Sequence, residues 1–217
     1  MNKKVLVVAA HPDDEILGCG GTVAKHVNNG DVVSAVIVCE GESHRSYGKD
    51  TNQASSINNS ARIIGFNKVY HLALPDQKLD TLPLVSVIKP IEEVISQVKP
   101  NVIYVHWGGD LNRDHQIVFE SLMVSARPIN STVREIYAFE TSSSTEWAFP
   151  RGFNPDTWVD ISAFIEIKLQ AFECYESELR DYPHPRSLRA LRVKAEAWGS
   201  QCCLESAEVF MTVRNIR

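Results

Sequence analysis

Short apolar runs alternate with amphipathic helical patterns through the first two thirds of this chain. The runs are apolar enough for strands that are buried on both faces. Their alternation with helices of about 12 residues is typical of βαβ units and of a parallel sheet. We therefore predict an α/β fold of Rossmann-like type, with a mostly parallel sheet and helices on both faces. The expected strands are 4–10, 32–39, 68–74, 101–106 and 134–140, and the expected helices are 15–28, 52–64, 84–98 and 114–126.

The pattern is weaker after residue 140. The sequence shows no repeat, no low-complexity tract and no interdomain linker. We therefore expect residues 1–217 to form a single domain. The elements expected in the last third are a long loop at 141–153, a strand at 158–161, a helix at 163–179, a turn at 182–187, a helix at 188–199 and a closing strand at 207–213.

Composition narrows the classes of partner. The chain has 217 residues, 44% of them hydrophobic, and a formal net charge of −5. Its basic residues are scattered, whereas nucleic-acid-binding faces are basic, so we expect no nucleic-acid partner. No stretch approaches the roughly 18 apolar residues of a membrane span, and the apolar run before His11 is too short for a signal peptide. The five cysteines lack C-x-x-C spacing, which is typical of reduced thiols. We expect a cytoplasmic protein without a membrane span.

Polar side chains follow four of the expected strands. The carboxyl ends of parallel strands meet at one rim, which is where ligands bind in open α/β sheets. We therefore expect these side chains to converge at that rim, although they come from separate segments. They are His11, Glu40, Asp76 and His106.

The segment after the first strand, Ala10-His11-Pro12-Asp13-Asp14-Glu15, places an imidazole and three carboxylates where a strand meets a helix. Pro12 stiffens this turn, so that His11 and Asp14 can aim at one point. Histidine nitrogen and aspartate oxygen are ligands that a catalytic zinc accepts. A third ligand from the cluster at 110–115 would leave one position open for water, and Asp13 could take the proton. The alternative is a plain helix N-cap, where Asp is common; the His-Pro pair and the second histidine-bearing loop favour the metal site.

These residues make the chain resemble the LmbE-like N-deacetylases, a family that includes the PIG-L N-acetylglucosaminyl-phosphatidylinositol deacetylase. The family's A-H-P-D-D-E segment is matched without change by residues 10–15, and its Asp-His pair is matched by Asp114-His115. The resemblance covers nearly the whole chain. It implies zinc-dependent hydrolysis of an N-acetylated amino sugar or sugar conjugate to acetate and free amine. Weaker matches lie at 74–76, 185–187 and 207–210.

The resemblance also implies roles for single residues. Asp13 becomes the general base, and Asp114 a supporting carboxylate behind the metal histidine. Asp76 is expected near the substrate hydroxyls or as a group that positions the site. The zinc ligands implied by the family are His11, Asp14 and His115.

One position departs from the family. Many members have a histidine three residues before the metal histidine, and this chain has Asn112 there. An amide can donate a hydrogen bond to an oxyanion but cannot deliver a proton at neutral pH. We therefore expect Asp13 to act first as base and then as acid, with His184 and His106 as the alternative proton donors.

The remaining candidates concern substrate contacts. Trp107 could form a stacking wall for a sugar, with core packing as the alternative, and Arg186 and His184 are expected at the substrate. Arg45, Lys49 and Arg151 are candidates for contacts with a substrate phosphate, with solvated surface as the alternative. Trp147 and Phe149 are candidates for a lid, with a packed or oligomer-contacting loop as the alternative. A non-catalytic zinc- or carbohydrate-binding protein, and a deacylase of a non-sugar amide, remain open as functions. So does a homo-oligomer.

Overall fold

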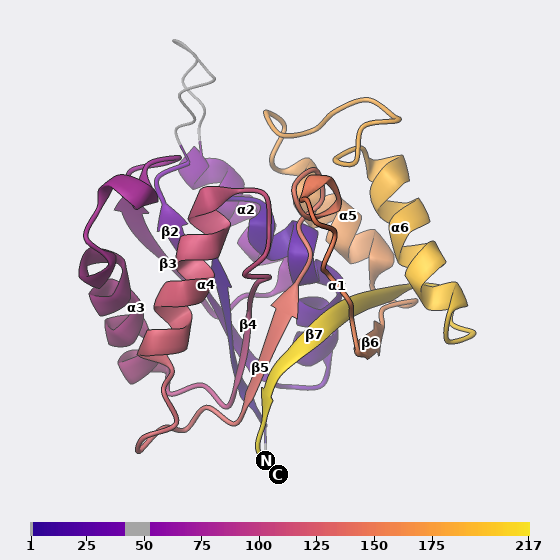
Figure 1. Cartoon of the computed structure of the whole chain (residues 1–217). Helices are drawn as coiled ribbons and strands as arrows, with labels where there is room; N and C mark the ends of the chain where they lie inside the picture. Colours follow the sequence, from indigo (N-terminus) through magenta and orange to yellow (C-terminus); the bar gives the residue numbers. More distant parts are fainter. Residues whose placement is uncertain (1, 42–52) are drawn as a thin grey trace.

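A seven-stranded sheet forms the centre of the molecule (Figure 1). The computed structural model describes residues 2–41 and 53–217, and the strand order is β3-β2-β1-β4-β5-β7-β6. Strands β1 to β5 are parallel, whereas β7 is antiparallel to both β5 and β6. The predicted mostly parallel sheet is confirmed. The strands are β1 Lys4–Ala9, β2 Val32–Cys39, β3 Lys68–Leu74, β4 Val102–His106, β5 Glu135–Phe139, β6 Thr157–Asp160 and β7 Ala207–Asn215.

Helices cover both faces of the sheet, as predicted (Figure 1). One apolar core lies between the sheet and helices α1, α2, α5 and α6, and a second core lies between the sheet and helices α3 and α4. The side chains of β1 divide between these cores: Val5 and Val7 point into the first, and Leu6 and Val8 into the second. This alternation explains why the strand is apolar at every position after Lys4. The helices are α1 Asp14–Asn28, α2 Gln53–Ile64, α3 Leu84–Val98, α4 Arg113–Ser125, α5 Ile165–Glu173 and α6 Leu188–Ser200, with short 3-10 helices η1 Leu79–Thr81 and η2 Thr145–Trp147.

The strand order creates a crevice beside β1. From β1 the chain passes through α1 to β2 on one side, and it later returns through α3 to β4 on the other side. The connections therefore diverge at the carboxyl ends of β1 and β4. Such a switch point is the usual ligand site of open α/β sheets. His11 follows β1 and the N-terminus of α4 follows β4, so both predicted metal-binding segments start there.

Helix α1 differs from the predicted continuous helix because its backbone breaks at Cys19, with φ −148° and ψ 23°. A buried ion pair from α5 and β7 satisfies the backbone groups that this break frees. Glu208 accepts hydrogen bonds from the N–H groups of residues 21–22, and Lys168 donates to the carbonyl of Leu17 and to Glu208. The local sequence alone does not reveal these distant partners.

Other boundaries differ less. The helix predicted at 163–179 is shorter, since α5 ends at Glu173 and turns follow it, and the closing strand continues to Asn215. The glycines before and after Cys19 allow close packing: a Cβ added to Gly21 would lie 2.8 Å from Ile161 Cδ1. None of the helices in the described residues has the length and apolar character needed to cross a membrane.

Candidate active site

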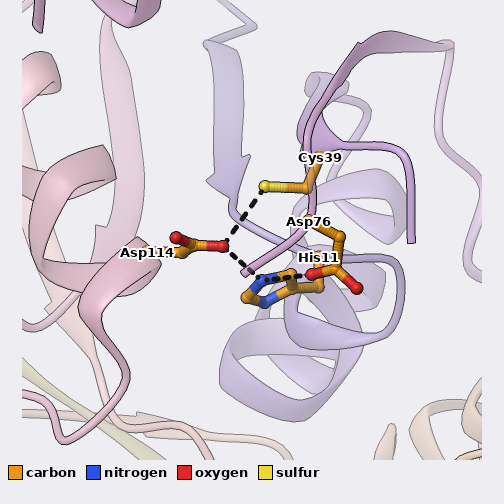
Figure 2. Close-up of side chains that lie close together, drawn as sticks. All are labelled: His11, Cys39, Asp76 and Asp114. Carbon is orange, nitrogen blue, oxygen red and sulfur yellow. Dashed lines mark hydrogen bonds and ion pairs between the residues drawn. The ribbon is translucent and has the colours of Figure 1, made fainter. Parts of the chain in front are cut away.

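His11 lies at the centre of the polar residues on this rim, and its two ring nitrogens face different groups. Nε2 lies 3.1 Å from Asp114 Oδ2 and 3.1 Å from Asp76 Oδ1 (Figure 2). Nδ1 lies 3.1 Å from Asp14 Oδ2. Burial lowers the pKa of His11, but its hydrogen bonds to Asp114, Asp14 and Asp76 outweigh burial and raise that pKa well above its usual value. The three carboxylates therefore favour a positively charged His11 ring.

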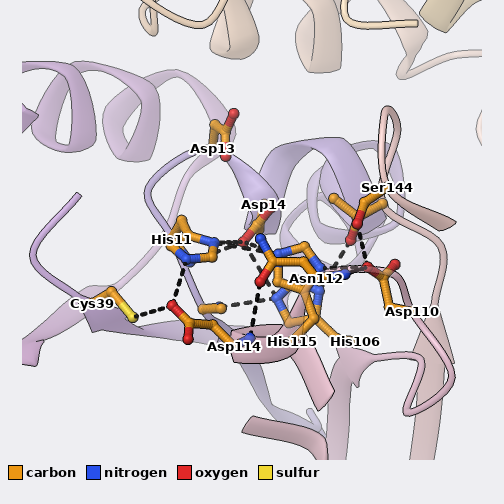
Figure 3. A network of polar contacts seen from close by, with 12 residues as sticks. His11, Asp13, Asp14, Cys39, His106, Asp110, Asn112, Asp114, His115 and Ser144 are labelled. Atoms are coloured by element: carbon orange, nitrogen blue, oxygen red, sulfur yellow. Dashed lines mark hydrogen bonds and ion pairs between the residues drawn. The ribbon is translucent and has the colours of Figure 1, made fainter. Parts of the chain in front are cut away.

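His115 completes a triangle of donor atoms with His11 and Asp14 (Figure 3). Its Nε2 lies 3.3 Å from Asp14 Oδ2 and 3.3 Å from His11 Nδ1. Ligand atoms bound tetrahedrally to zinc at 2.0–2.1 Å are about 3.3 Å apart. The three side chains that the family resemblance implied as ligands thus lie together, and their donor atoms suit a zinc ion with one position open.

Asp110 fixes the orientation of the His115 ring. Its Oδ1 lies 3.1 Å from His115 Nδ1, so that Nε2 is left to face the other two ligands. The hydroxyls of Ser144 and Thr145 also donate to Asp110, as does the backbone N–H of Asn112. Burial opposes ionisation of Asp110, but these hydrogen bonds and His115 together lower its pKa to about 2. Asp110 is therefore an anion that holds the His115 ring with its Nε2 toward His11 and Asp14.

Asp114 supports the other histidine, His11, rather than its sequence neighbour His115. Its Oδ2 accepts from the backbone N–H of Gln77 at 2.8 Å, and its Oδ1 accepts from that of Leu79 at 3.1 Å. These contacts fix the carboxylate beside His11 Nε2. The expected supporting role thus acts on the histidine of a different segment.

Asp13 occupies a strained backbone position beside the triangle, with φ 110°. Its Oδ2 is buried and accepts no hydrogen bond from the described residues, although Arg186 Nη1 lies 3.5 Å away. Burial, followed by the charges of Asp14 and Glu178, raises the pKa of Asp13 well above its usual value. A carboxylate with an unused oxygen at the cavity wall is suited to accept and return a proton.

Asn112 forms the N-cap of α4 and also lines the cavity. Its side-chain oxygen accepts from the backbone N–H of Asp114 at 2.9 Å. The amide nitrogen is therefore the atom left to donate to a ligand, which agrees with the hydrogen-bonding role expected from the sequence.

His106, one of the alternative proton donors, is fully buried and does not line the cavity. Its Nε2 accepts from the backbone N–H of Ala10 at 2.9 Å, and its Nδ1 lies 3.0 Å from Thr141 Oγ1. Burial, together with the neighbouring His115, lowers its pKa to about 4. The ring stacks on His115 with centroids 3.9 Å apart. His106 is thus a neutral histidine that packs behind the site.

A cavity of about 490 Å³ opens over these residues. Of the expected substrate contacts, Asp76 and Arg186 line this cavity. Trp147, a candidate for a lid, lines it as well. Arg186 pairs with Glu178, which also lines the cavity. Its charge is therefore already partly neutralised within the protein.

Two expected substrate contacts do not line this cavity. Trp107 packs edge-on against Phe153 with centroids 5.9 Å apart. His184 packs edge-on against Trp147 at 5.9 Å, and its Nδ1 accepts from the backbone N–H of Arg186. Phe149 is 96% exposed and Arg151 is exposed as well. Arg45 and Lys49 lie outside the described residues.

Glu15 is a buried acid of the site whose partner was missed by sequence reasoning. Its carboxylate accepts from the Tyr175 hydroxyl at 2.5 Å and from the backbone N–H of Asp13 at 3.0 Å. Burial raises the pKa of Glu15 to about 7. The sequence provides Glu15 itself, but nothing in it connects Tyr175 to a residue 160 positions earlier.

Known proteins of similar sequence and fold include deacetylases. The chain is 29% identical to the "uncharacterized deacetylase YaiS" of Escherichia coli, over 81% of this chain and 91% of that protein. It is 26% identical to the diacetylchitobiose deacetylase of Thermococcus kodakarensis, over 81% of this chain and 70% of that protein. The fold is similar to that of the crystal structure of the conserved protein TT1542 from Thermus thermophilus, with a TM-score of 0.82, 24% identity and coverage of 99% and 96%.

A family model identifies the chain directly. The model described as PIG-L, GlcNAc-PI de-N-acetylase, matches residues 6–126, which is more than half of the chain and includes all three residues of the donor triangle. The enzyme class expected from the sequence, a metal-dependent N-deacetylase, is confirmed by this match. The protein belongs to the PIG-L de-N-acetylase family.

Proposed function

We propose that this protein is a zinc-dependent hydrolase that removes the N-acetyl group from an amino sugar or a sugar conjugate. The observation that carries the proposal is the donor triangle of His11, Asp14 and His115 beside the unpartnered Oδ2 of Asp13, in one cavity. A related protein is named for its action on diacetylchitobiose, which supports an N-acetylated sugar as the substrate class. Which N-acetylated sugar is hydrolysed is to be determined by a substrate panel.

His11, Asp14 and His115 would hold the zinc ion, which when bound supplies Lewis-acid polarisation and a nucleophile at neutral pH. Asp13 accepts the proton that the attacking water gives up, because its Oδ2 has no other hydrogen-bond donor in the described residues. The oxygen adds to the carbonyl carbon, and the C–N bond then breaks. Asp13 returns the same proton to the amine nitrogen, so acetic acid and free amine leave, and the acid then loses its remaining proton to solvent or to the amine and becomes acetate.

Two neighbours assist this transfer. The side-chain amide of Asn112 donates to the carbonyl oxygen as negative charge develops there, and one such donor is worth about 2.7–4 kcal/mol. Arg186, paired with Glu178, lies close to Asp13 and keeps its carboxylate facing the cavity. Because Arg186 and Glu178 lie outside residues 6–126, the site uses the rest of the chain, which supports one functional domain over 1–217.

The test is release of acetate and amine from N,N′-diacetylchitobiose, N-acetylglucosamine and its conjugates, with the zinc-loaded protein. We expect Asp13→Asn to bind zinc normally and to lose about 10²- to 10⁴-fold in kcat. The matched control is Asp31→Asn, which changes a carboxylate paired with His26 away from the site and should leave kcat unchanged.

Two results would redirect the proposal. If the zinc-loaded wild type released amine only from amides without a sugar, the deacylase alternative would replace the sugar deacetylase. If it bound zinc and sugar but released amine from no substrate in the panel, the protein would be a binding module.

A further inference from the structure

A second group of metal-ligating atoms lies on the far side of His11 from the donor triangle. It consists of His11 Nε2, Cys39 Sγ, Asp76 Oδ1 and Asp114 Oδ2, all within 4.8 Å of one another (Figure 2). These residues come from four places in the fold: the turn after β1, the end of β2, the segment after β3 and the first turn of α4, which follows β4. The strand ends of the parallel sheet bring them together.

The distances within this group suit one tetrahedral ion. His11 Nε2 lies 3.1 Å from Asp76 Oδ1 and 3.1 Å from Asp114 Oδ2, and Cys39 Sγ lies 3.7 Å from Asp114 Oδ2. Around zinc, pairs of nitrogen and oxygen ligands are about 3.3 Å apart, and a sulfur and an oxygen about 3.6 Å apart. Three of the distances between these ligand atoms are therefore already close to those of a tetrahedral zinc site.

Gln77 donates to both carboxylates of this group, through its backbone N–H to Asp114 Oδ2 at 2.8 Å and through its Nε2 to Asp76 Oδ1 at 3.4 Å. The single hydrogen that Nε2 of His11 can carry faces the same two carboxylates, and the Cys39 thiol donates to Asp114 Oδ2. Cys39 is fully buried, so bulk water does not reach its thiol. A dication would satisfy all four atoms together. Asp76 and Gln77 line the cavity, which provides the entry path.

We propose that His11, Cys39, Asp76 and Asp114 form a second, thiolate-containing site for zinc or cobalt that competes with the donor triangle for His11. Binding there displaces the thiol proton of Cys39 to solvent. A neutral imidazole has one nitrogen free to ligate, so an ion on Nε2 leaves the proton on Nδ1. The triangle then retains only Asp14 and His115. Excess metal would therefore inhibit the enzyme by moving His11 from one ion to the other.

Cobalt titration of the metal-free protein tests the site without an activity assay. Thiolate ligation of Co²⁺ produces an intense near-ultraviolet charge-transfer band, which a site of nitrogen and oxygen ligands lacks. The exposed or partly exposed cysteines are first replaced by serine to remove adventitious thiolates; they are Cys174, Cys202 and Cys203. In this background the first equivalent of Co²⁺ should give no thiolate band, and further equivalents should produce one.

Two cysteine variants separate the site from the background. Cys39→Ser changes the volume little and retains a hydroxyl donor near Asp114 but should abolish the band, whereas Cys19→Ser, which changes a buried thiol of α1, should retain it. Asp76→Asn should also weaken the band, and circular dichroism confirms that each variant is folded. A band that persists in Cys39→Ser, or that never forms in the wild type at several equivalents, would overturn the proposal.

Inhibition provides a second readout. The rate of hydrolysis by the wild type should fall as zinc exceeds one equivalent. For each variant, the rate with excess zinc is compared with the rate of the same variant at one equivalent. Cys39→Ser should lose this inhibition and Cys19→Ser should keep it. The cobalt band does not depend on turnover, so the second site stands or falls separately from the proposed deacetylase activity.

Discussion

Each histidine of the proposed zinc site is held by a carboxylate on the nitrogen that points away from the donor triangle. Asp110 contacts Nδ1 of His115, and Asp114 contacts Nε2 of His11. Such a contact fixes which nitrogen carries the hydrogen and which nitrogen faces the ion, and it increases the basicity of the ligand. The precision of the donor triangle therefore depends on residues that do not belong to it.

Asp110→Asn tests this dependence. The amide would either present its NH₂ group to His115 or offer a neutral oxygen, so the histidine loses its anionic partner. We expect zinc affinity to fall by about 10- to 100-fold, measured by competition with a chromophoric chelator. Asp31→Asn, which also removes a carboxylate from a histidine pair, should leave zinc affinity unchanged. Equal zinc affinities in the Asp110 variant and the wild type would show that the ring is held by packing on His106 instead.

Among single residues, the sequence predicts the candidate metal ligands better than it predicts the residues that hold them in place. His11, Asp13 and Asp14 are adjacent in one segment, and their shared segment makes the cluster visible. Cys39, in contrast, gains its partner only when the end of β2 meets the start of α4, and Glu15 only when the turn after α5 packs against α1. Trp107 follows a strand as His11 does, yet its ring packs on Phe153, because an apolar side chain is not constrained to face the polar rim.

At the scale of elements, the break in α1 is the feature with the largest energetic consequence. Lys168 and Glu208 are both buried, and together they satisfy three backbone groups at the break. The first part of α1 carries the donor Asp14, so this ion pair also determines where the first turn lies relative to the sheet. A buried pair costs desolvation, but removing one partner leaves an unpaired charge, which costs more.

Lys168→Met should therefore destabilise the fold by about 3–5 kcal/mol, because Glu208 loses its cation and the carbonyl of Leu17 loses its donor. Equilibrium unfolding in urea measures this change. The matched control is Arg192→Met, which breaks an exposed pair with Glu166 and should leave the midpoint unchanged. If both variants unfolded at the wild-type midpoint, the break in α1 would not depend on the ion pair.

Most elements follow from periodicity, but three features of the fold do not. The antiparallel direction of β7 is invisible to a pattern of apolar residues, because burial is the same in either direction. Helix α5 ends at Glu173, although the apolar spacing continues to Leu179. Turns replace the helix there, and the carbonyl of Tyr175 accepts hydrogen bonds from the N–H groups of Glu178 and Leu179. The positive φ of Asp13 is set by the tight strand-to-helix turn, whereas residue type alone would favour a negative value.

At the scale of the whole molecule, the site connects segments that are far apart in sequence. The β1–α1 turn, the start of α1 and α4 provide the donor triangle, the segment after β5 provides Ser144 and Thr145, and the segment before α6 provides Arg186. Without an ion, the buried carboxylates of Asp13 and Asp14 lie close together, and their mutual repulsion opposes folding. Bound zinc should therefore stabilise the fold as a whole.

Removal of the metal should lower the melting temperature, which differential scanning calorimetry measures with and without a chelator. At zinc a thousandfold above its Kd, binding to the native state contributes about 4 kcal/mol. In a chain of this size each kcal/mol shifts Tm by about 2–4 °C, so zinc should raise Tm by about 8–16 °C. His115→Ala removes one donor of the triangle and should lose most of this zinc-dependent rise. Cys39→Ser retains the triangle and should keep it. An identical Tm for the chelated and zinc-loaded wild type would mean that no ion binds between His11, Asp14 and His115, and the proposed hydrolase chemistry would have to be abandoned.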